Sequence, residues 1–358
     1  MSKIILSFGT LGQGGAAQVC ANLSYPLCNT FDSVILVTWA DWPQFNEFDE
    51  RARWYCVEKE AGGTNEFKRM KWFRKFVKVE KPDMILSFLE PWNLRVLVST
   101  MGLGVKTVVA ERNEPHSVNK YWIMDQVEKL IYRLSDGILV QTPTIKKFFN
   151  GVLENRTTII YNPVNIEKEM VGKAINTPKS KRIISVARLM PQKNHDILIK
   201  AFAKFSKRHP EYTLTIYGEG PLMEDLKLLS KKENIADKVL LPGPSKTIHK
   251  DILDADMMCL VSVREGMSNS MIEAMCLGLP CICTKVSGAV DLIEDGKNGM
   301  LVNIGDINEL VEKMNSLADD QDLNNTIRIN AIKLYNILNK EKIYNEWITY
   351  INKCLITK

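Results

Sequence analysis

Two glutamates and the loop between them form the most informative stretch of the sequence. Glu265 follows the apolar segment 257–261, and Glu273 lies eight residues further along, inside a predicted helix. A small polar residue, Ser268 or Asn269, can cap that helix, and the N–H groups of its first turn favour an anionic ligand. Both carboxylates can therefore address one ligand that lies across the helix N-terminus. This ordered pattern is far more specific than two glutamates alone.

Two cations stand at another predicted helix start in the same half of the chain. Arg188 follows the predicted strand 182–187, and Lys193 comes five residues later, in Pro191-Gln192-Lys193-Asn194. A guanidinium and an ammonium group that flank a helix N-terminus suit a diphosphate. Gly218-Glu219-Gly220-Pro221 follows the next predicted strand and adds a second glycine-rich turn.

A glycine-rich loop, Gly9–Ala17, follows the first predicted strand and opens a helix. Its glycines allow the backbone to approach a phosphate or another substrate, or they serve the geometry of the turn alone. It is not a P-loop, because no G-K-[ST] ends it. Gly12-x-Gly14-x-x-Ala17 formally matches the dinucleotide fingerprint, with Asp41 roughly where a ribose-binding acid can sit. However, Gly12 lies too far beyond the strand for the tight turn that this fingerprint requires.

The segment 65–82 carries the strongest local charge of the chain. Its lysines Lys68, Lys71, Lys75 and Lys78 have the spacing of one stripe on a helix, beside an apolar stripe. Such a basic amphipathic helix suits an anionic membrane surface or a phosphate-bearing partner. The alternative is a solvated basic face on a helix that packs against the core. A net charge of only +5 argues against a nucleic-acid-binding surface.

A polar cluster follows the predicted strand 106–110. It reads Glu111-Arg112-Asn113-Glu114-Pro115-His116. Polar groups at the carboxyl end of a strand in an α/β domain usually face the binding site. A general base or a binding contact can come from this cluster, or Asn113 and Ser117 simply cap a helix.

Short apolar runs alternate with amphipathic helical patterns along the whole chain, on either side of a polar linker at 161–180. Continuous apolar runs are typical of parallel strands that are buried on both faces. The pattern predicts two doubly wound α/β domains. The predicted strands are 3–8, 33–39, 53–57, 83–88, 106–110, 137–141 and 157–160, then 182–187, 213–217, 238–241, 257–261 and 280–284. The predicted helices include 16–27, 66–79, 121–134, 144–152, 197–208, 221–232, 268–277, 307–317 and a helical stretch 323–355.

Composition fits an intracellular globular protein. Hydrophobic residues make up 45% of the 358 residues and charged residues 25%, which excludes disorder as the main state. The longest apolar run, 274–283, is too short to span a bilayer. The eight cysteines contain no C-x-x-C pair and lie mostly in apolar runs, so we expect reduced, buried thiols.

Taken together, these motifs resemble the retaining glycosyltransferases of family four, which have the GT-B architecture. The resemblance covers the whole chain and includes the Asn-Pro linker and the segment 291–299. It implies two Rossmann-like doubly wound domains that face a central cleft. Residues 1–165 are expected to bind the acceptor and residues 166–340 the nucleotide sugar. A C-terminal helix, 341–358, is expected to cross back to the first domain.

The resemblance also assigns roles to individual residues. Arg188 and Lys193 are expected to hold the diphosphate of a UDP-sugar and to stabilise the departing UDP. Glu265 is expected to contact the donor sugar near its anomeric carbon, so these three are the expected catalytic residues. Glu273 is expected to accept hydrogen bonds from the ribose. The other expected donor contacts are Gly14, Gly15, Gly218, Gly243, Gly266, Met267, Ser268 and Asn269.

Some members of the family assemble bacterial surface polysaccharides or lipid-linked oligosaccharides, and carry a basic helix that holds the lipid-linked diphosphate of the acceptor. The helix Lys68–Lys81 resembles it. The expected acceptor contacts are Arg112, Asn113, Lys68, Lys71, Lys75 and Lys78. Many members have a His at the position of Arg112, and this departure leaves the contacts there open.

The implied reaction transfers a hexose or an N-acetylhexosamine from a UDP-sugar to a glycan acceptor, linked to polyprenyl diphosphate, with retention at the anomeric carbon. The family needs neither a cofactor nor a metal, because the two cations replace the metal's charge. Asp254-Ala255-Asp256 resembles the metal-binding D-x-D motif, but it leads into an apolar strand and is interpreted structurally. The implied location is the cytoplasmic face of the cell membrane, in peripheral contact with anionic lipid.

Three other functions stay open at this stage. An NAD-dependent oxidoreductase would use Gly12, Gly14 and Asp41, but it leaves the segment from Glu265 to Glu273 unexplained. A sugar-nucleotide epimerase can share the two-domain architecture, and a non-catalytic module can bind UDP without turnover. The sequence does not determine the donor sugar, the acceptor, the linkage or the oligomeric state. Nor does it decide whether Glu265 is a nucleophile or the donor phosphate deprotonates the acceptor.

Overall fold

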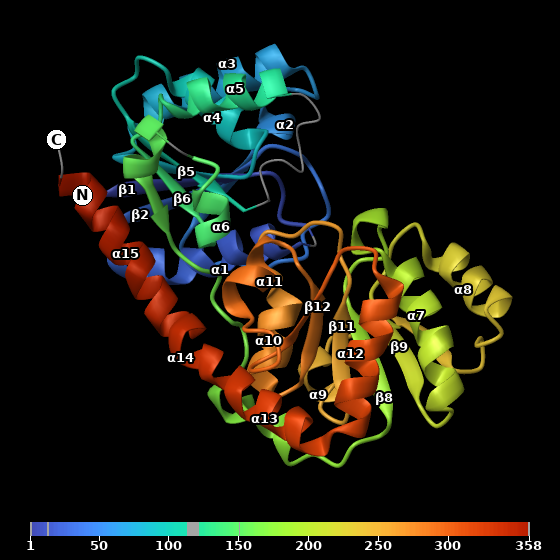
Figure 1. Cartoon of the computed structure of the whole chain (residues 1–358). Coiled ribbons are helices and arrows are strands. Elements are labelled where there is room, and N and C mark those ends of the chain that lie inside the picture. The colour runs from blue at the N-terminus through green and yellow to red at the C-terminus, as the bar shows by residue number, and fades with distance from the viewer. Residues whose placement is uncertain (1, 13, 113–121, 150, 357–358) are drawn as a thin grey trace. The chain divides into compact units, whose positions relative to one another are not determined.

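The computed structural model describes residues 2–12, 14–112, 122–149 and 151–356. The chain forms two compact units, each a parallel sheet with helices on both faces (Figure 1). The N-terminal unit consists of Met1–Pro163 together with Lys340–Lys358, and the C-terminal unit of Val164–Asn339. The predicted α/β class, with two doubly wound sheets, is confirmed.

The N-terminal unit has a seven-stranded parallel sheet in the order β3-β2-β1-β4-β5-β6-β7. Its strands are β1 (Lys3–Phe8), β2 (Ser33–Thr38), β3 (Arg53–Cys56), β4 (Met84–Phe88), β5 (Lys106–Glu111), β6 (Gly137–Val140) and β7 (Thr157–Ile159). In β1, Ile4 and Leu6 face one hydrophobic core while Ile5 faces another. Burial on both faces explains why the central strands appear in the sequence as continuous apolar runs.

The helices of the N-terminal unit are α1 (Gly15–Thr30), α2 (Val57–Glu60), α3 (Glu66–Glu80), α4 (Trp92–Thr100), α5 (Trp122–Tyr132), α6 (Pro143–Lys146) and α15 (Lys340–Ile356), with a 3-10 helix η2 (Gly151–Arg156). Helices α3, α4 and α5 lie side by side on one face of the sheet, and α1 packs with α15 on the other (Figure 1).

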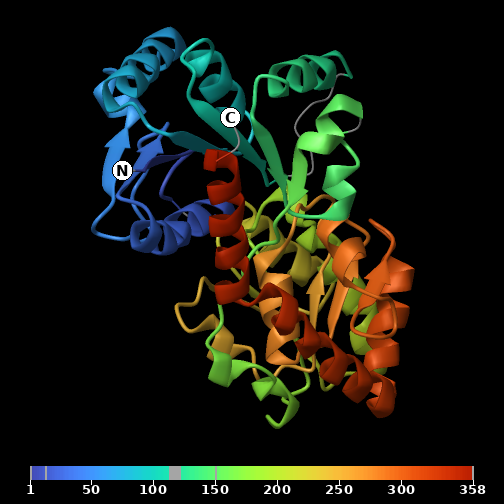
Figure 2. The ribbon, with the colours of Figure 1, turned by 90° about the vertical axis from the view of Figure 1, so that its left-hand side faces the viewer.

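Helix α15 is built into the core of the N-terminal unit (Figure 2). Trp347 is fully buried, and its ring centroid lies 5.7 Å from that of Phe88 in β4. The helix also passes so close to β6 that a Cβ on Gly137 would lie 2.1 Å from the Tyr350 hydroxyl oxygen. The last helix therefore belongs structurally to the first part of the chain.

The C-terminal unit has a six-stranded parallel sheet in the order β10-β9-β8-β11-β12-β13. Its strands are β8 (Arg182–Val186), β9 (Thr213–Tyr217), β10 (Val239–Gly243), β11 (Met257–Leu260), β12 (Cys281–Thr284) and β13 (Met300–Val302). Helices α7 (His195–Arg208), α8 (Met223–Lys232), α12 (Ile307–Asp319) and α13 (Gln321–Ala331) contribute to a single large core on one face.

The remaining helices of this unit are short and position loops. They are α9 (Ile248–Asp251), α10 (Asn269–Leu277), α11 (Ser287–Leu292) and α14 (Tyr335–Leu338), with the 3-10 helices η3 (Lys168–Met170), η4 (Lys173–Ile175), η5 (Pro191–Lys193) and η6 (Ile332–Leu334). Helix α10 follows β11 and carries Glu273, and the loop that leads into it carries Glu265; α11 follows β12.

One predicted helix is wrong. Among its described residues, the segment 144–152 contains only part of the short helix α6 and the beginning of η2. Gly151 has a φ of +66°, a left-handed conformation that an α-helix cannot continue through. The apolar side chains Phe148 and Phe149 gave the segment a helical appearance, but they pack into a local cluster with Tyr132 of α5.

Candidate active site

The N-terminus of α10 is built by local capping and by a close backbone contact. Ser268 is the N-cap residue, and its Oγ accepts a hydrogen bond from the Met271 N–H at 3.4 Å. Gly288 of α11 supports the preceding loop, because a Cβ there would lie 2.3 Å from the Gly266 carbonyl oxygen. Only glycine allows this approach, so α11 fixes the backbone of Gly266 and Met267. The predicted donor-binding segment 266–269 thus lies on the turn that starts α10.

Glu265 and Lys193 form an ion pair, although 72 residues separate them in sequence. Each side chain is only 14% exposed. Ser262 donates a second hydrogen bond to the same carboxylate oxygen of Glu265, Oε1, at 2.9 Å. The predicted sugar contact and one of the predicted diphosphate cations therefore meet at the carboxyl end of the sheet.

Gln192 brings the two loops together. Its carbonyl oxygen accepts the Val263 N–H at 2.9 Å, and its side-chain Nε2 donates to the Arg264 carbonyl at 2.9 Å. Two hydrogen bonds, made by the residues just before Lys193 and Glu265, thereby join the loop after β8 to the loop after β11. This contact makes the pairing of Lys193 with Glu265 a property of the fold.

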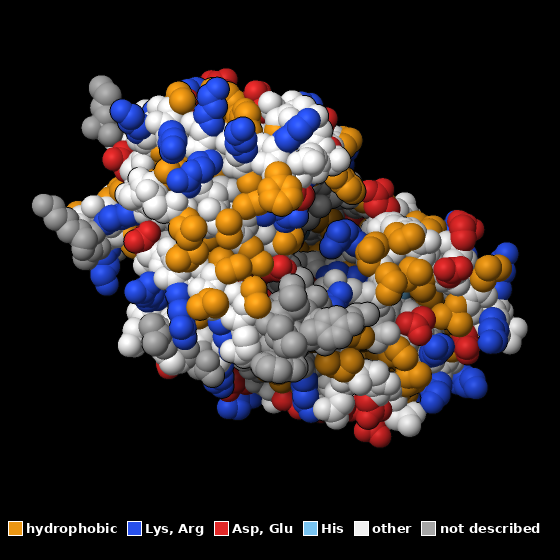
Figure 3. Space-filling model, turned by 90° about the horizontal axis from the view of Figure 1, so that it is seen from above, with side chains coloured by type: hydrophobic (Ala, Val, Ile, Leu, Met, Phe, Trp, Pro, Cys, Tyr) orange, Lys and Arg blue, Asp and Glu red, His pale blue; other side chains and the backbone are white. Residues whose placement is uncertain are grey.

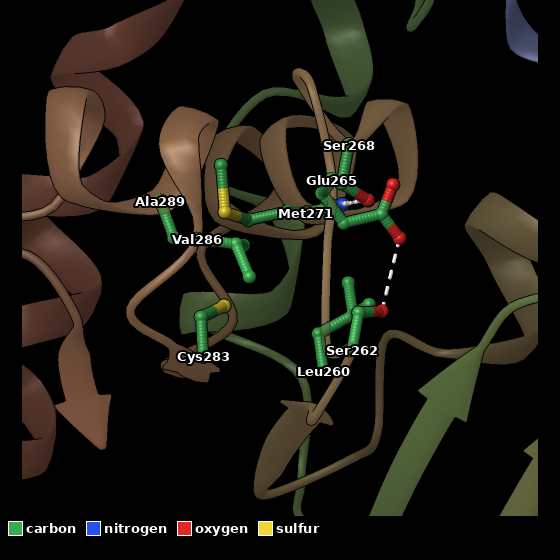
Figure 4. Close-up of a pocket in the computed structure, with 8 residues that line it drawn as sticks. All are labelled: Leu260, Ser262, Glu265, Ser268, Met271, Cys283, Val286 and Ala289. Atoms are coloured by element: carbon green, nitrogen blue, oxygen red, sulfur yellow. Dashed lines mark hydrogen bonds between the residues drawn. The ribbon is translucent and has the colours of Figure 1, made fainter. Parts of the chain in front are cut away.

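A small pocket opens beside Glu265 (Figure 4). Its polar lining consists of Ser262, Glu265 and Ser268, and Figure 4 shows the Ser262 hydroxyl directed at the Glu265 carboxylate. The other lining residues are Leu260, Met271, Cys283, Val286 and Ala289. Burial raises the pKa of the Cys283 thiol far above its usual range, so this sulfur stays protonated and non-nucleophilic.

Arg188 stands apart from this pair. Its side chain is exposed, and its guanidinium has no hydrogen bond or ion pair among the residues that the structure describes. The loop that carries it touches the β9–α8 turn, because Cβ atoms on Gly218 and Gly220 would lie 2.0 Å from the Ala187 oxygen and 2.4 Å from the Leu189 oxygen. Gly218, a predicted donor contact, therefore supports the loop of Arg188. The guanidinium is available to an anion.

His195, the first residue of α7, lies directly behind Lys193. It is only 1% exposed. Burial lowers the pKa of His195 to about 4, against the opposing effect of a hydrogen bond with the Arg188 backbone, and the positive charge of Lys193 lowers it further. The imidazole is therefore neutral near pH 7 and adds no charge to the site.

Glu273 lies one turn inside α10 and faces α9. Its Oε2 is 3.1 Å from Nε2 of His249. Gly243 ends β10 with a φ of +88°, and a Cβ there would meet no atom within 4 Å. The structure thus brings Arg188, Lys193, Glu265 and Glu273 into one unit. Sequence reasoning missed His249 and Gly288, which come from other elements, α9 and α11. It also missed Ser262, which lies three residues before Glu265 in the same loop but forms no recognisable motif.

The predicted basic stripe on α3 is present. Asn65 caps the helix by accepting the Lys68 N–H at 3.1 Å. Two other cations of the segment point inward: Arg69 pairs with Glu58 at 2.8 Å, and Arg74 donates to the carbonyl of Ser99 at 2.9 Å. The lysines that stay exposed, without an ion pair to any described residue, are Lys68, Lys71, Lys75 and Lys78. Figure 3 shows basic side chains gathered over this side of the N-terminal unit.

The glycine-rich first loop is exposed at Gly14 and Gly15. Gly14 precedes α1 with a φ of +148°, which favours glycine. Asn46 holds the loop from the side by donating to the Gly12 carbonyl at 2.6 Å. Asp41, the acid that a dinucleotide site would need, forms an ion pair with Lys59 at 2.9 Å. That pairing removes the main support for a dinucleotide in this loop.

Arg112, a predicted acceptor contact, lies in the core. It is 5% exposed, and its guanidinium carbon is 5.1 Å from the Trp347 ring and 5.8 Å from the Phe88 ring. Its Nη1 donates to the Asn162 side chain at 3.1 Å. In this structure the side chain packs under α15, which is a structural position. Asn113, the neighbouring predicted contact, lies outside the described residues.

Within the described ranges, no group of His, Cys, Asp and Glu side chains has the arrangement to hold a metal ion. Asp254, from the D-x-D-like segment, pairs with Arg182 at the start of β8. None of the eight cysteines, all of which lie in the described ranges, is in a disulfide, and six of them are buried. Across the part of the chain that the structure describes, no helix combines the length and apolar character needed to cross a bilayer.

Comparison with known proteins finds glycosyltransferases among the relatives of this chain. Two relatives from Campylobacter jejuni align with 98% of the chain. One, 25% identical over 98% of its own length, is a GalNAc-alpha-(1->4)-GalNAc-alpha-(1->3)-diNAcBac-PP-undecaprenol alpha-1,4-N-acetyl-D-galactosaminyltransferase. The other, 27% identical over 100% of its own length, is an N-acetylgalactosamine-N,N'-diacetylbacillosaminyl-diphospho-undecaprenol 4-alpha-N-acetylgalactosaminyltransferase.

Among solved structures, Anabaena HepE in complex with UDP and glucose superposes with a TM-score of 0.81. It is 17% identical, and the match covers 99% of this chain and 100% of that one. At this identity the likeness establishes the fold, which is GT-B. Residues 167–334, which carry the paired cations and the paired glutamates, match the family model of glycosyl transferases group 1. The chain is thus a glycosyltransferase of the GT-B fold, with its group 1 domain in the C-terminal unit.

Proposed function

We propose that the protein is a retaining glycosyltransferase that transfers an N-acetylhexosamine or a hexose from a UDP-sugar to a glycan carried on polyprenyl diphosphate. The observation that carries the proposal is the ion pair of Lys193 with Glu265, in the loop that leads to the N-terminus of α10, with the exposed Arg188 on the same loop as Lys193. Two cations beside a helix N-terminus suit a diphosphate, and a carboxylate beside them suits the sugar attached to it.

The roles follow from charge. In the transition state the sugar ring becomes positive and the leaving phosphate becomes negative. Arg188, exposed and unpaired among the described residues, and Lys193 are placed to stabilise the leaving diphosphate. Glu265, held by Ser262 and Lys193, offers a fixed negative charge to the sugar. Glu273 accepts hydrogen bonds from the ribose, while the backbone at 266–269 contacts the sugar hydroxyls.

The two cations take the electrostatic role that a divalent metal plays in other transferases. We therefore expect turnover without added metal. Addition of EDTA to the purified enzyme leaves the initial rate unchanged if this assignment is right. A rate that is abolished by EDTA and restored by Mg²⁺ or Mn²⁺ contradicts it.

Two features support an N-acetylhexosamine donor and a lipid-linked acceptor. The Campylobacter relatives are N-acetylgalactosaminyltransferases whose acceptors are diphospho-undecaprenol glycans. The exposed lysine stripe on α3 suits either the acceptor's diphosphate or the anionic surface of the membrane that contains it. The proposal therefore includes peripheral attachment to the cytoplasmic face of the membrane, in surface polysaccharide or oligosaccharide assembly.

A thermal-shift panel without metal tests the proposed binding of a UDP-sugar donor. The ligands are UDP, several UDP-sugars, several GDP-sugars and NAD. At 100 times its Kd, a ligand adds about 2.7 kcal/mol to the free energy of unfolding. We expect stabilisation by UDP and by at least one UDP-sugar, and its loss in Glu273→Ala. Stabilisation by NAD alone contradicts the proposal, and release of UDP with no transferred sugar favours an epimerase.

A further inference from the structure

His249 contacts one of the four residues on which the donor site depends. Its Nε2 lies 3.1 Å from Oε2 of Glu273, and the two residues come from different helices, α9 and α10. The histidine side chain is 28% exposed and the glutamate side chain 15%. The pair therefore lies at the edge of the site, with the carboxylate on its inner side.

The remainder of α9 is held rigidly, so the imidazole has a fixed base. The Thr247 hydroxyl donates to Asp251 Oδ1 at 3.1 Å, and the Ser245 hydroxyl binds the other oxygen of the same carboxylate. Arg182, from the start of β8, donates to the Asp251 carbonyl. These contacts join the two ends of the short helix to one another and attach its C-terminal end to β8.

The Glu273 carboxylate is engaged on one side. Oε2 has His249, whereas Oε1 has no hydrogen-bond partner among the described residues. A hydrogen bond to one carboxylate oxygen fixes the orientation of the whole carboxylate, and therefore the direction of the other oxygen. In the same way, a residue outside the binding site orients a metal-ligating or catalytic histidine by binding its other ring nitrogen. A partly exposed pair of this kind contributes little to folding stability, so orientation is the more substantial effect.

We propose that His249 is the positioning residue for Glu273, and that it sets the preference of the donor site for a ribonucleotide over a deoxyribonucleotide. This inference rests on the proposed function, in which Glu273 accepts hydrogen bonds from the ribose of UDP. His249 does not itself touch the nucleotide in this arrangement. It holds the carboxylate so that Oε1 meets the ribose hydroxyls, and its loss lets the carboxylate rotate away.

The test is a titration of the purified full-length protein with three nucleotides: UDP, 2′-deoxy-UDP and 3′-deoxy-UDP. The variants are His249→Leu, which removes the hydrogen bond, and His249→Gln, whose amide can restore it. Glu273→Ala gives the ratio of UDP affinity to deoxy-UDP affinity that is expected when the ribose contact is absent. Lys250→Ala, an exposed neighbour on the same helix, is the matched control.

We expect the wild-type protein to bind UDP more tightly than at least one of the deoxy analogues. In His249→Leu, UDP affinity falls by about tenfold, the scale of losses at outer residues that orient a binding group. The affinity of this variant for the deoxy analogue that lacks the contacted hydroxyl changes little. The ratio of UDP affinity to deoxy-analogue affinity therefore falls toward the ratio found in Glu273→Ala. His249→Gln regains part of the ratio, and Lys250→Ala keeps the wild-type values.

The possible failures are distinguishable. If the wild-type protein does not bind UDP, the proposed function itself is wrong. If UDP binds and Glu273→Ala abolishes the discrimination while His249→Leu keeps it, the positioning role is wrong. An equal loss of affinity for all three nucleotides also overturns it, because His249 then only shapes the local structure. Should His249→Leu fail to fold, the same comparison is made between wild type, His249→Gln and His249→Asn.

Discussion

The Lys193 ammonium and the Glu265 carboxylate neutralise one another inside the C-terminal unit. Both side chains are 14% exposed, and Ser262 donates a hydrogen bond to the same carboxylate oxygen, Oε1. Removal of either charge leaves the other partly buried without its partner, which is costly. The two groups must therefore be treated as a single electrostatic unit, and substitutions of them are expected to be strongly non-additive.

Glu265→Gln keeps the size and the hydrogen-bonding capacity of the side chain but removes its charge. We expect kcat to fall by about 10²–10³, the scale measured for preorganised groups that stabilise transition-state charge. UDP affinity stays within a few-fold of wild type, because the nucleotide contacts are elsewhere. Initial rates and UDP titrations on the same preparation check both. Intact UDP binding with normal turnover would show that Glu265 has no catalytic role.

Arg188→Met and Lys193→Met are expected to differ in stability but not in activity. Each lowers kcat by about 10²–10³ through loss of leaving-group stabilisation. Arg188 is exposed, so Arg188→Met leaves the free energy of unfolding unchanged. Lys193→Met leaves the Glu265 carboxylate without its ion-pair partner and lowers the free energy of unfolding by about 1–3 kcal/mol. Urea denaturation measures the difference.

A double variant separates the two effects of Lys193. In Lys193→Met with Glu265→Gln, no unpaired charge remains at this position, so much of the lost stability returns while activity stays low. Stability that is lower in the double variant than in Lys193→Met would contradict the idea that the pair is a unit.

Much of the fold could be predicted because buried parallel strands leave a strong pattern. The run Lys3–Phe8 was predicted with its bounds, since both faces of β1 are covered and every residue after the first is buried. Shorter elements left too little pattern. Strand β13 has only three residues, Met300–Val302, and helix α11 only six, so neither can show a period.

The site could be predicted only where its residues are close in sequence. Glu265 and Glu273 share one loop and one helix, so their spacing is visible. His249 reaches the Glu273 carboxylate through tertiary structure, and no spacing rule indicates it. Ser262 is only three residues before Glu265, but a single serine after a strand forms no motif that would indicate its role. Arg112 shows the opposite error, because a strand-end position predicts a binding residue. It cannot reveal that the last helix covers that position with Trp347.

The lysine stripe on α3 predicts electrostatic binding to anionic membranes. Near an anionic surface each lysine contributes about 1 kcal/mol. Replacement of Lys68, Lys71, Lys75 and Lys78 by Gln is therefore expected to weaken binding to phosphatidylglycerol vesicles by up to about 10³-fold. Vesicle sedimentation at low and high salt measures this, with phosphatidylcholine vesicles as the neutral reference.

The matched control removes the same charge from the other unit. Lys227, Lys231, Lys232 and Lys297 are exposed in the C-terminal unit, and their replacement by Gln changes the net charge equally. If both quadruple variants lose the same affinity, only net charge matters and α3 is not the docking surface. Unchanged activity of the α3 variant on a lipid-diphosphate acceptor would also refute its role in acceptor docking.

Trp347 is expected to hold the last helix in place. Its side chain is fully buried against Phe88 and Arg112, and its indole nitrogen has no hydrogen-bond partner among the described residues, so its contribution is from packing. Trp347→Ala should lower the free energy of unfolding of the N-terminal unit by about 3–5 kcal/mol. Ile356→Ala, at an 81% exposed position on the same helix, should change it by less than about 0.5 kcal/mol. Equal effects of the two substitutions would show that α15 does not depend on this anchor.

His195 is expected to make the C-terminal unit less stable in acid. Burial lowers the pKa of His195 in the folded protein to about 4, from its ordinary value of 6.5. Between these pH values the unfolded chain binds the proton and the folded chain does not, so the free energy of unfolding falls as pH falls. The contribution is complete above pH 6.5 and is lost by about pH 4, with a total of about 3 kcal/mol.

His195→Leu removes the titrating group, so the stability of this variant should depend less on pH across this window. Urea denaturation of both proteins at intervals from pH 4 to pH 7 gives the difference, in which carboxylates common to both cancel. Parallel curves for the two proteins would mean that His195 is not buried as a neutral imidazole.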